Sequence, residues 1–302
     1  MVFGSLARRE FTQGSDVDWA VMIDGRADSG HLKVVHSLKS ELKKAGFEEP
    51  GPTEVFGGLV FSHDLIHAIG GDEDTNKNMT RRLLLLLESA SVDASESERV
   101  HNRIVNGVLH RYVVEDASFT SGNSRKNRIP RFLLNDVVRF WRTMAVDYAN
   151  KYRSREGQKW ALRNIKLRMS RKLLFISGFL MCISWALNEI EDHDEEFIVQ
   201  QLVGYLRRWT QRPPLESLAT IVQRYAPSLT AEIFDNYDSF LALLGDEKKR
   251  ELLEKLGPDD AYKDSVFLEA RQVATNFDEA LIKLLFRSDD KITQLAEKYG
   301  VF

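Results

Sequence analysis

The chain has 302 residues and a single cysteine, Cys182, which excludes an internal disulfide. One cysteine among apolar neighbours is typical of core packing in a reducing compartment. The N-terminus lacks the basic region and apolar run of a secretion signal. The longest apolar run, 173–187, contains Ser177 and Gly178 and is short for a membrane span. We therefore expect a cytoplasmic protein without a membrane partner, and a buried helix at 173–187.

The chain also lacks an excess of positive charge. It has 42 Lys and Arg against 45 Asp and Glu, a net charge of −3. No basic-aromatic platform is evident either, so we do not expect a nucleic-acid partner. The hydrophobic fraction of 43% and charged fraction of 29% are ordinary for a globular protein. The length predicts a sizeable core and two domains.

The residues best suited to chemistry lie near the N-terminus. A Gly4-Ser5 turn is followed by a polar loop and then by Asp16 and Asp18, on alternate positions of the predicted strand 16–23. Side chains at i and i+2 of a strand share a face, so the two carboxylates project together and repel. Mg²⁺ relieves such repulsion and binds one or two carboxylates plus phosphate oxygens. The Gly-Ser turn offers backbone N–H groups and a hydroxyl to a phosphate. The simpler alternative is a surface strand whose acids only prevent edge pairing.

This pattern, Gly4-Ser5 followed by Asp16-x-Asp18, resembles the signature of the DNA-polymerase-β-like nucleotidyltransferase superfamily. The flanks 6–10 and 14–18 are most similar to two bacterial branches. One is the minimal nucleotidyltransferases, and the other is related to the uridylyltransferase that modifies the PII signalling protein. The resemblance is carried by residues 3–24, extends to about residue 90, and is only architectural beyond.

The resemblance implies transfer of a nucleoside monophosphate from a triphosphate, ATP or UTP, to a hydroxyl of a protein or small-molecule acceptor, with release of pyrophosphate. Asp16 and Asp18 would bind two Mg²⁺ ions, with Mn²⁺ as a substitute. The triphosphate would be held by Gly4, Ser5, Arg9 and Ser15. The alternative function is a catalytically weak or inactive nucleotide-binding regulator, a sensor or an antitoxin-like module.

The superfamily normally adds a third carboxylate, which helps to hold the metal and can accept the proton of the attacking hydroxyl. No apolar-acid-apolar strand supplies one clearly here. Asp64 directly follows the predicted strand 55–61 and is the first candidate for this catalytic role, before Asp74 and Glu54. A missing third carboxylate would favour the weak or inactive alternative.

Periodicity predicts an α+β fold with a small mixed sheet and a large helical domain. A helix at 31–45, with Gly46 as its C-cap, separates the strands 16–23 and 55–61. The segment 62–76 is expected to be a polar loop, and helices dominate from residue 79 onward. We therefore predict a catalytic domain at 1–117, a connecting loop at 118–128 and a helical substrate or nucleotide domain at 129–302. The helical half could also hold a second subunit, so a homo-oligomer is left open.

Basic residues concentrate in the predicted helical domain. Nine basic residues and one acid, Glu156, lie between 151 and 172. Three of them, Lys159, Arg163 and Lys166, follow helical spacing, as do Asn135, Arg139 and Arg142 in the preceding helix. Because the chain as a whole is negative, this concentration predicts an anion site, with a nucleoside triphosphate as the ligand bound by Lys159, Arg163, Lys166 and Arg139. The alternatives are a solvated face or pairing with acids elsewhere in the fold.

Overall fold

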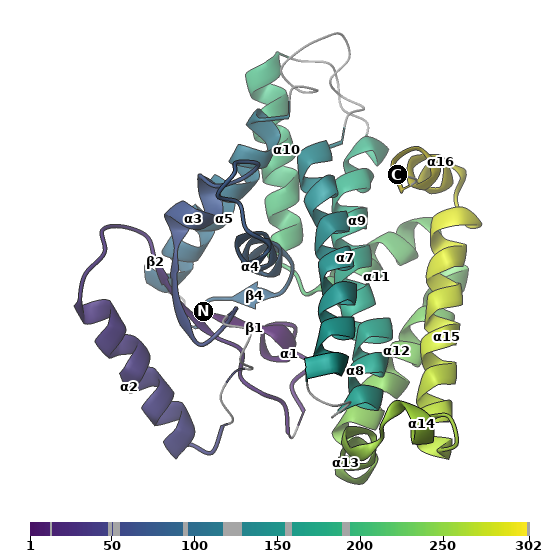
Figure 1. Cartoon of the computed structure of the whole chain (residues 1–302). Coiled ribbons are helices and arrows are strands. Elements are labelled where there is room, and N and C mark those ends of the chain that lie inside the picture. The colour runs from purple at the N-terminus through teal and green to yellow at the C-terminus, as the bar shows by residue number, and fades with distance from the viewer. Residues whose placement is uncertain are drawn as a thin grey trace. The chain divides into compact units, whose positions relative to one another are not determined.

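The computed structural model describes residues 1–12, 14–47, 50, 55–92, 96–116, 129–154, 159–188 and 194–300, without the side chains of 151–154 (Figure 1). The chain forms two compact units. Unit 1 combines Met1–Asp136 with Ile190–Pro213, and unit 2 combines Val137–Glu189 with Pro214–Phe302. The described residues are mostly helical, with a small strand region, so the coarse expectation of an α+β, mainly helical fold is confirmed.

Four short strands of unit 1 form two pairs. The strands are β1 (Val2–Phe3), β2 (Ala20–Ile23), β3 (Gly58–Phe61) and β4 (Ser89–Ala90). β1 pairs with β4 antiparallel, and β2 pairs with β3 parallel from Ala20↔Gly58 to Ile23↔Phe61. An antiparallel bridge between Val2 and Trp19 adds the segment before β2 to β1. The strands therefore form two two-stranded sheets, one antiparallel and one parallel, where the sequence predicted one small mixed sheet.

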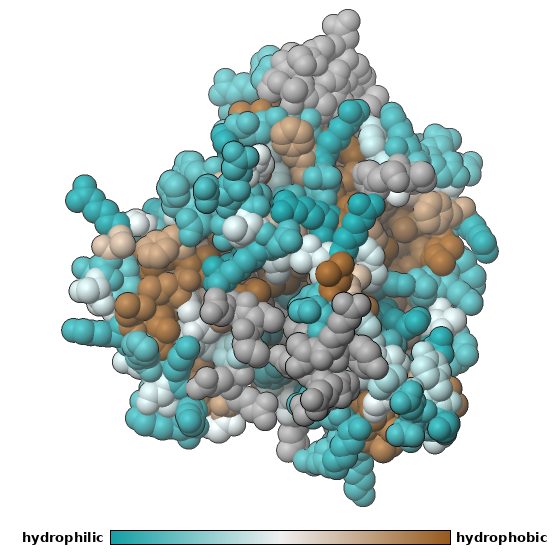
Figure 2. Space-filling view, in the orientation of Figure 1, coloured by the Kyte–Doolittle hydropathy of each residue, from teal (hydrophilic) through white to brown (hydrophobic). Residues whose placement is uncertain are grey.

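Helix α2 (Gly30–Lys44) covers the segment that leads into β2. Val17, Trp19 and Val35 form a buried cluster, and four partly buried residues pack against it: Val21, Leu38, Leu42 and Leu59. Apolar surface also gathers on the left of Figure 2, in the area of α2. Gly46 adopts φ +84° directly after this helix, and the Phe47 N–H donates to the Leu42 carbonyl at 3.0 Å. The predicted glycine C-cap is confirmed.

Helices surround the strands of unit 1. They are α1 (Gly4–Ala7), α3 (Ser62–Ile66), α4 (Asn76–Leu87), α5 (Glu96–Val114), α10 (Glu195–Thr210) and the start of α7 (Arg131–Ser154). Helix α3 corrects the prediction of a loop throughout 62–76. Its Leu65 is 1% exposed and Ile69 after it is 8% exposed, so these two apolar residues fold the segment against the core rather than leaving it in solvent.

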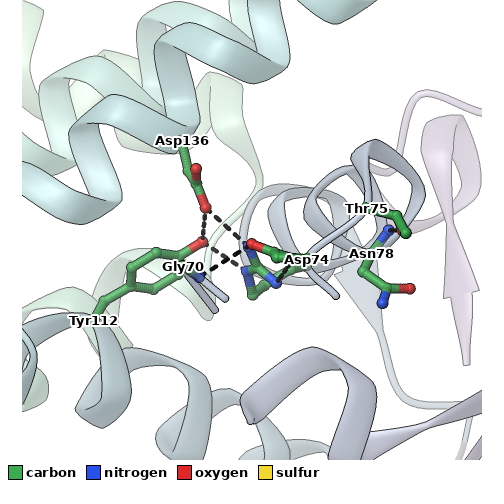
Figure 3. A network of polar contacts seen from close by, with 7 residues as sticks. Gly70, Asp74, Thr75, Asn78, Tyr112 and Asp136 are labelled. Carbon is green, nitrogen blue, oxygen red and sulfur yellow. Dashed lines mark hydrogen bonds and ion pairs between the residues drawn. The ribbon is translucent and has the colours of Figure 1, made fainter. Parts of the chain in front are cut away.

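A buried polar network joins α4, α5 and α7 (Figure 3). The guanidinium of Arg82 donates to both carboxylate oxygens of Asp74 at 3.0 and 2.8 Å, to Asp136 at 2.9 Å and to the Tyr112 hydroxyl at 2.6 Å. The Tyr112 hydroxyl in turn donates to Asp136 at 2.5 Å. Burial alone would lower the pKa of Arg82, but these bonds, led by Asp74, raise it above its ordinary value. Arg82 therefore stays charged inside the core.

Unit 2 contains most of α7 and the remaining helices. They are α8 (Trp160–Lys166), α9 (Lys172–Ile183), α11 (Pro214–Tyr225), α12 (Thr230–Gly245), α13 (Glu247–Lys255), α14 (Pro258–Ala261), α15 (Ser265–Phe286) and α16 (Asp290–Gly300). A π-helical turn, Leu167–Arg171, joins α8 to α9. The helical run Trp160–Leu187 is long and apolar enough to cross a membrane, but 72% of its most apolar window is buried within the protein, as in the core helix of a soluble protein.

The division into units differs from the predicted domain boundary. The predicted loop, 118–128, lies outside the described residues, and the two units separate between Asp136 and Val137 inside α7. Asp136 belongs to unit 1 because its carboxylate is part of the Arg82 network. Helix α10 also belongs to unit 1, because it packs along α5. Neither contact can be read from local periodicity.

Replacing Tyr112 by Phe should weaken the buried network. The change removes one hydroxyl and leaves Arg82 and Asp136 with unsatisfied polar atoms, so the free energy of unfolding should fall by about 1–3 kcal/mol. Denaturant unfolding measures this change in the free energy of unfolding. Tyr262→Phe is the matched control, because Tyr262 is 48% exposed, and its change should stay within about 0.5 kcal/mol. Equal stability of the two variants would contradict the role of the network.

His101 should make stability pH-dependent. Its Nε2 lies 2.8 Å from the Ser89 hydroxyl of β4, and burial lowers the pKa of the imidazole. As the pH falls, His101 of the unfolded chain takes up a proton near pH 6.5, whereas His101 of the native state does so only at lower pH. The His101 contribution is therefore present above about pH 6.5 and lost as the pH falls.

Urea unfolding between pH 5 and pH 8 tests this effect. The His101→Gln variant should lose less stability on acidification than the wild type, whereas His36→Gln, at an exposed position of α2, should follow the wild type. A wild-type pH dependence in His101→Gln would show that another group is responsible.

Candidate functional site

Asp16 and Asp18 precede β2 and alternate with core residues. Val17 is 6% exposed and Trp19 is 3% exposed, whereas Asp16 is exposed and Asp18 is half-buried. In extended backbone this alternation directs Val17 and Trp19 to the core face and both carboxylates to the opposite face. This burial pattern supports a shared face for the two predicted metal ligands.

The backbone of Gly4 lies against Asp18. Gly4 has φ +64°, and a Cβ placed on it would lie 2.8 Å from Asp18 Oδ2. The adjacent Phe3 N–H donates to the Asp18 carbonyl at 2.9 Å, which fixes this approach. Only glycine satisfies both the left-handed backbone and the close contact. The Gly-Ser turn and the carboxylate pair therefore belong to one site, and Ser5 follows as the second residue of α1.

Arg9 terminates α1. It adopts φ +62°, its N–H donates to the Leu6 carbonyl, and the next N–H, of Glu10, donates to the Ser5 carbonyl at 2.8 Å. This is a Schellman cap with arginine at the position that glycine usually takes. The side chain of Arg9 is exposed. Its predicted contact with a nucleotide stays a prediction.

Arg8, which the sequence reasoning did not select, anchors this loop. Its guanidinium pairs with Glu10 at 2.8 Å and with Glu88, a buried residue directly before β4. Because β4 pairs with β1, the ion pair ties the Gly-Ser turn to the neighbouring strand. In the sequence, Glu88 stands out only as a single acid after the apolar run 83–87. Its partner Arg8 lies eighty residues away, and no local pattern identifies that pairing.

Ser15 stabilises the turn before the carboxylates. Its hydroxyl accepts a hydrogen bond from the Thr12 N–H at 3.2 Å and lies 3.1 Å from the Thr12 hydroxyl. These contacts shape the loop that delivers Asp16. They give Ser15 a structural role, and its predicted contact with a nucleotide stays a prediction.

The structure places Asp64, the first candidate for the third carboxylate, apart from Asp16 and Asp18 along the strand pair. β2 and β3 are parallel, with Ile23 opposite Phe61, so Asp64 in α3 follows the far end of the pair, whereas Asp16 and Asp18 precede the near end. The four residues of β2 alone span about 13 Å, far beyond the reach of an ion bound at Asp18. The exposed Asp64 carboxylate instead lies 3.9 Å from His63.

The other two candidates do not fill the position either. Asp74 is bound to Arg82 through both of its oxygens, and Glu54 lies outside the described residues. Among the residues that the structure describes, no group of three or more His, Cys, Asp or Glu side chains could hold a metal. Two neighbouring carboxylates with substrate phosphates still fit Mg²⁺, which keeps few protein ligands, better than zinc.

Of the predicted anion-binding residues, Lys159 has an ion-pair partner within unit 2, and so does the neighbouring basic residue Lys172. Lys159 pairs with Glu254 at 2.9 Å, and Lys172 pairs with Asp278 at 2.5 Å. Burial alone would raise the pKa of Glu254, but the hydrogen bond from Lys159 and its charge lower the value below its ordinary range. Arg139, Arg163 and Lys166 also interact within the fold. Pairing with acids, the alternative interpretation, therefore holds for Lys159, and the nucleotide-binding role of the four residues stays a prediction.

Replacing Gly4 by Ala should disturb the contact with Asp18. Gly46→Ala is the matched control, because Gly46 also has positive φ but nothing lies within 4 Å of its added Cβ. Both changes should cost about 1–2 kcal/mol of unfolding free energy for the left-handed alanine. Gly4→Ala should cost at least about 1 kcal/mol more, because its Cβ meets the carboxylate. Equal losses in denaturant unfolding would contradict the close contact.

No family model, curated protein or solved structure matches the chain. The case for a site therefore rests on its own residues. These are two carboxylates on one face, a left-handed glycine against one of them, and an ion pair that anchors the intervening loop.

Proposed function

We propose that the chain is a Mg²⁺-dependent nucleotidyltransferase that moves a nucleoside monophosphate from ATP or UTP to a hydroxyl of a protein or small molecule. The observation that carries this proposal is the packing of Gly4 against Asp18, on the face that Asp18 shares with Asp16. The contact supports a site in which a phosphate-receiving turn adjoins a carboxylate pair. The resemblance to the polymerase-β-like superfamily supplies the reaction.

In this proposal Asp16 and Asp18 hold the divalent ions, Mg²⁺ or Mn²⁺. When bound, these ions supply charge neutralisation and a clamp on the phosphate oxygens. The Ser5 hydroxyl and the Gly4 backbone orient the β- and γ-phosphates. The acceptor oxygen forms a bond to the α-phosphorus, the α–β phosphoanhydride bond breaks, and the acceptor proton and pyrophosphate are released. Arg8 keeps the turn in place through Glu10 and Glu88.

A nucleotide-binding regulator is the second candidate function. Asp64 lies at the far end of the strands and Asp74 is neutralised by Arg82, so two of the three candidates for a proton-accepting carboxylate are occupied or remote. Such a protein would bind the metal–nucleotide complex through the same Asp16 and Asp18 without transferring it. Binding and transfer must therefore be measured separately.

The Asp16→Asn/Asp18→Asn variant tests the enzyme proposal. Removing even an outer-shell partner of a metal ligand costs about 10–100-fold in metal affinity or activity. The assay contains Mg²⁺, and desalted cell extract supplies the acceptors. Loss of both ligands should therefore lower transfer from α-³²P-labelled ATP or UTP at least about 100-fold. Asp64→Asn is the matched control and should transfer like the wild type. Transfer that persists in the double variant would overturn the site.

Isothermal titration with a non-hydrolysable triphosphate and Mg²⁺ separates the two functions. The enzyme proposal expects both binding and transfer in the wild type, and neither in the double variant. Binding that depends on Asp16 and Asp18 without any transfer would establish the regulator instead.

A further inference from the structure

A pocket of about 740 Å³ in unit 1 lies between α5 and α10 beside the end of α3. The three helices run next to one another in Figure 1. His67 of this pocket follows α3, beyond the Ile23↔Phe61 end of the strands, whereas Asp16 and Asp18 precede the opposite end. The pocket is therefore separate from the carboxylate site.

Two glycines shape this pocket. Gly107 of α5 allows close approach to α3, because an added Cβ would lie 2.8 Å from Ile66 Cδ1. Gly204 of α10 also lines the pocket, and an added Cβ would lie 3.9 Å from Arg208 Nη1, an ordinary contact distance. Helix α10 would tolerate a side chain at Gly204, and that side chain would occupy the pocket.

Hydrogen-bond donors dominate the polar lining. Six polar side chains line the pocket: His67, Asn106, His110, Arg111, Gln200 and Arg207. No Asp or Glu is among the described residues that line it. The nearby acids Glu115 and Glu196 engage Arg111 Nη1 and Gln200, respectively, from the helix surfaces.

Two arginines, Arg111 and Arg207, contribute to this lining. Their Nε atoms are inaccessible to solvent, so a ligand in the pocket would meet the terminal guanidinium nitrogens. Two guanidinium groups beside one pocket repel each other. An anion in the pocket would relieve this repulsion. The guanidinium fork matches the oxygens of a phosphate or carboxylate.

We propose that this pocket binds a small phosphate monoester with an apolar body. A phosphate monoester presents three acceptor oxygens to Arg111, Arg207 and the two histidines of the pocket, whereas a carboxylate presents two. The side chains of Ile66, Val114 and Val203 supply an apolar wall for the body of the ligand. The inference does not depend on the proposed nucleotidyl transfer.

Titration of the full chain with phenyl phosphate, followed by calorimetry, tests this site. We expect saturable binding that is tighter than binding of benzoate or inorganic phosphate. Arg207→Gln should weaken it at least about tenfold, because a charge-assisted hydrogen bond is lost. Arg99→Gln is the matched control, since Arg99 is an exposed residue of α5 outside the pocket, and it should bind like the wild type.

Two further variants keep the test decisive. Gly204→Leu should abolish binding by filling the pocket without altering any charge. Asp16→Asn/Asp18→Asn should bind phenyl phosphate like the wild type, because the carboxylate site is separate. The proposal is overturned if the wild type shows no saturable binding or binds benzoate as tightly as phenyl phosphate. It is also overturned if Arg207→Gln and Arg99→Gln lose affinity equally, if Gly204→Leu binds like the wild type, or if the aspartate variant loses binding.

Discussion

Burial of Val17 and Trp19 beneath α2 is the constraint on which the candidate site depends. Fully burying side chains of this size stabilises the fold by about 1.5–3 kcal/mol each. Two carboxylates about 6 Å apart at the protein surface repel by only about 0.7 kcal/mol in water. Hydrophobic burial therefore exceeds the repulsion and holds Asp16 and Asp18 on one face.

Two sets of ion pairs in unit 1 join residues that the folded core brings together. Arg82 takes up Asp74 and Asp136 in the interior, and Arg8 takes up Glu10 and Glu88 beside the Gly-Ser turn. Buried ion pairs of this kind contribute little net stability, but removing one partner is costly, so they determine which elements meet. The Arg82 network joins α4 and α5 to the start of α7, and the Arg8 pairs join the Gly-Ser loop to β4. Asp16 is left exposed.

The two candidate sites of unit 1 carry opposite charge. The face of Asp16 and Asp18 is acidic, whereas Arg111 and Arg207 line the pocket. They adjoin opposite ends of the parallel strand pair, because α3 continues from β3 at the Phe61 end. Separation along the strands lets one small unit hold both charges without mutual neutralisation. Both sites also use glycine where backbone or helices approach closely, at Gly4 and at Gly107.

Local features of the chain could be predicted from the sequence because they depend on residues only a few positions apart. The alternation of buried and exposed residues along 16–19 agrees with the predicted period of two. The period of 3.6 predicted α2, and Gly46 predicted its end. Most helices of unit 2 follow the same periodicity.

Only the tertiary structure decided which distant residues meet. The parallel register of β2 and β3 places Asp64 far from Asp18, and the buried Arg82 removes Asp74 from the candidates. The packing of α10 on α5 places Arg207 and Arg111 in the lining of one pocket, although a separate stretch of helices lies between them in the chain. Periodicity shows which face of a helix or strand is apolar. Which other helix or strand packs against that face depends on the packing of the whole core.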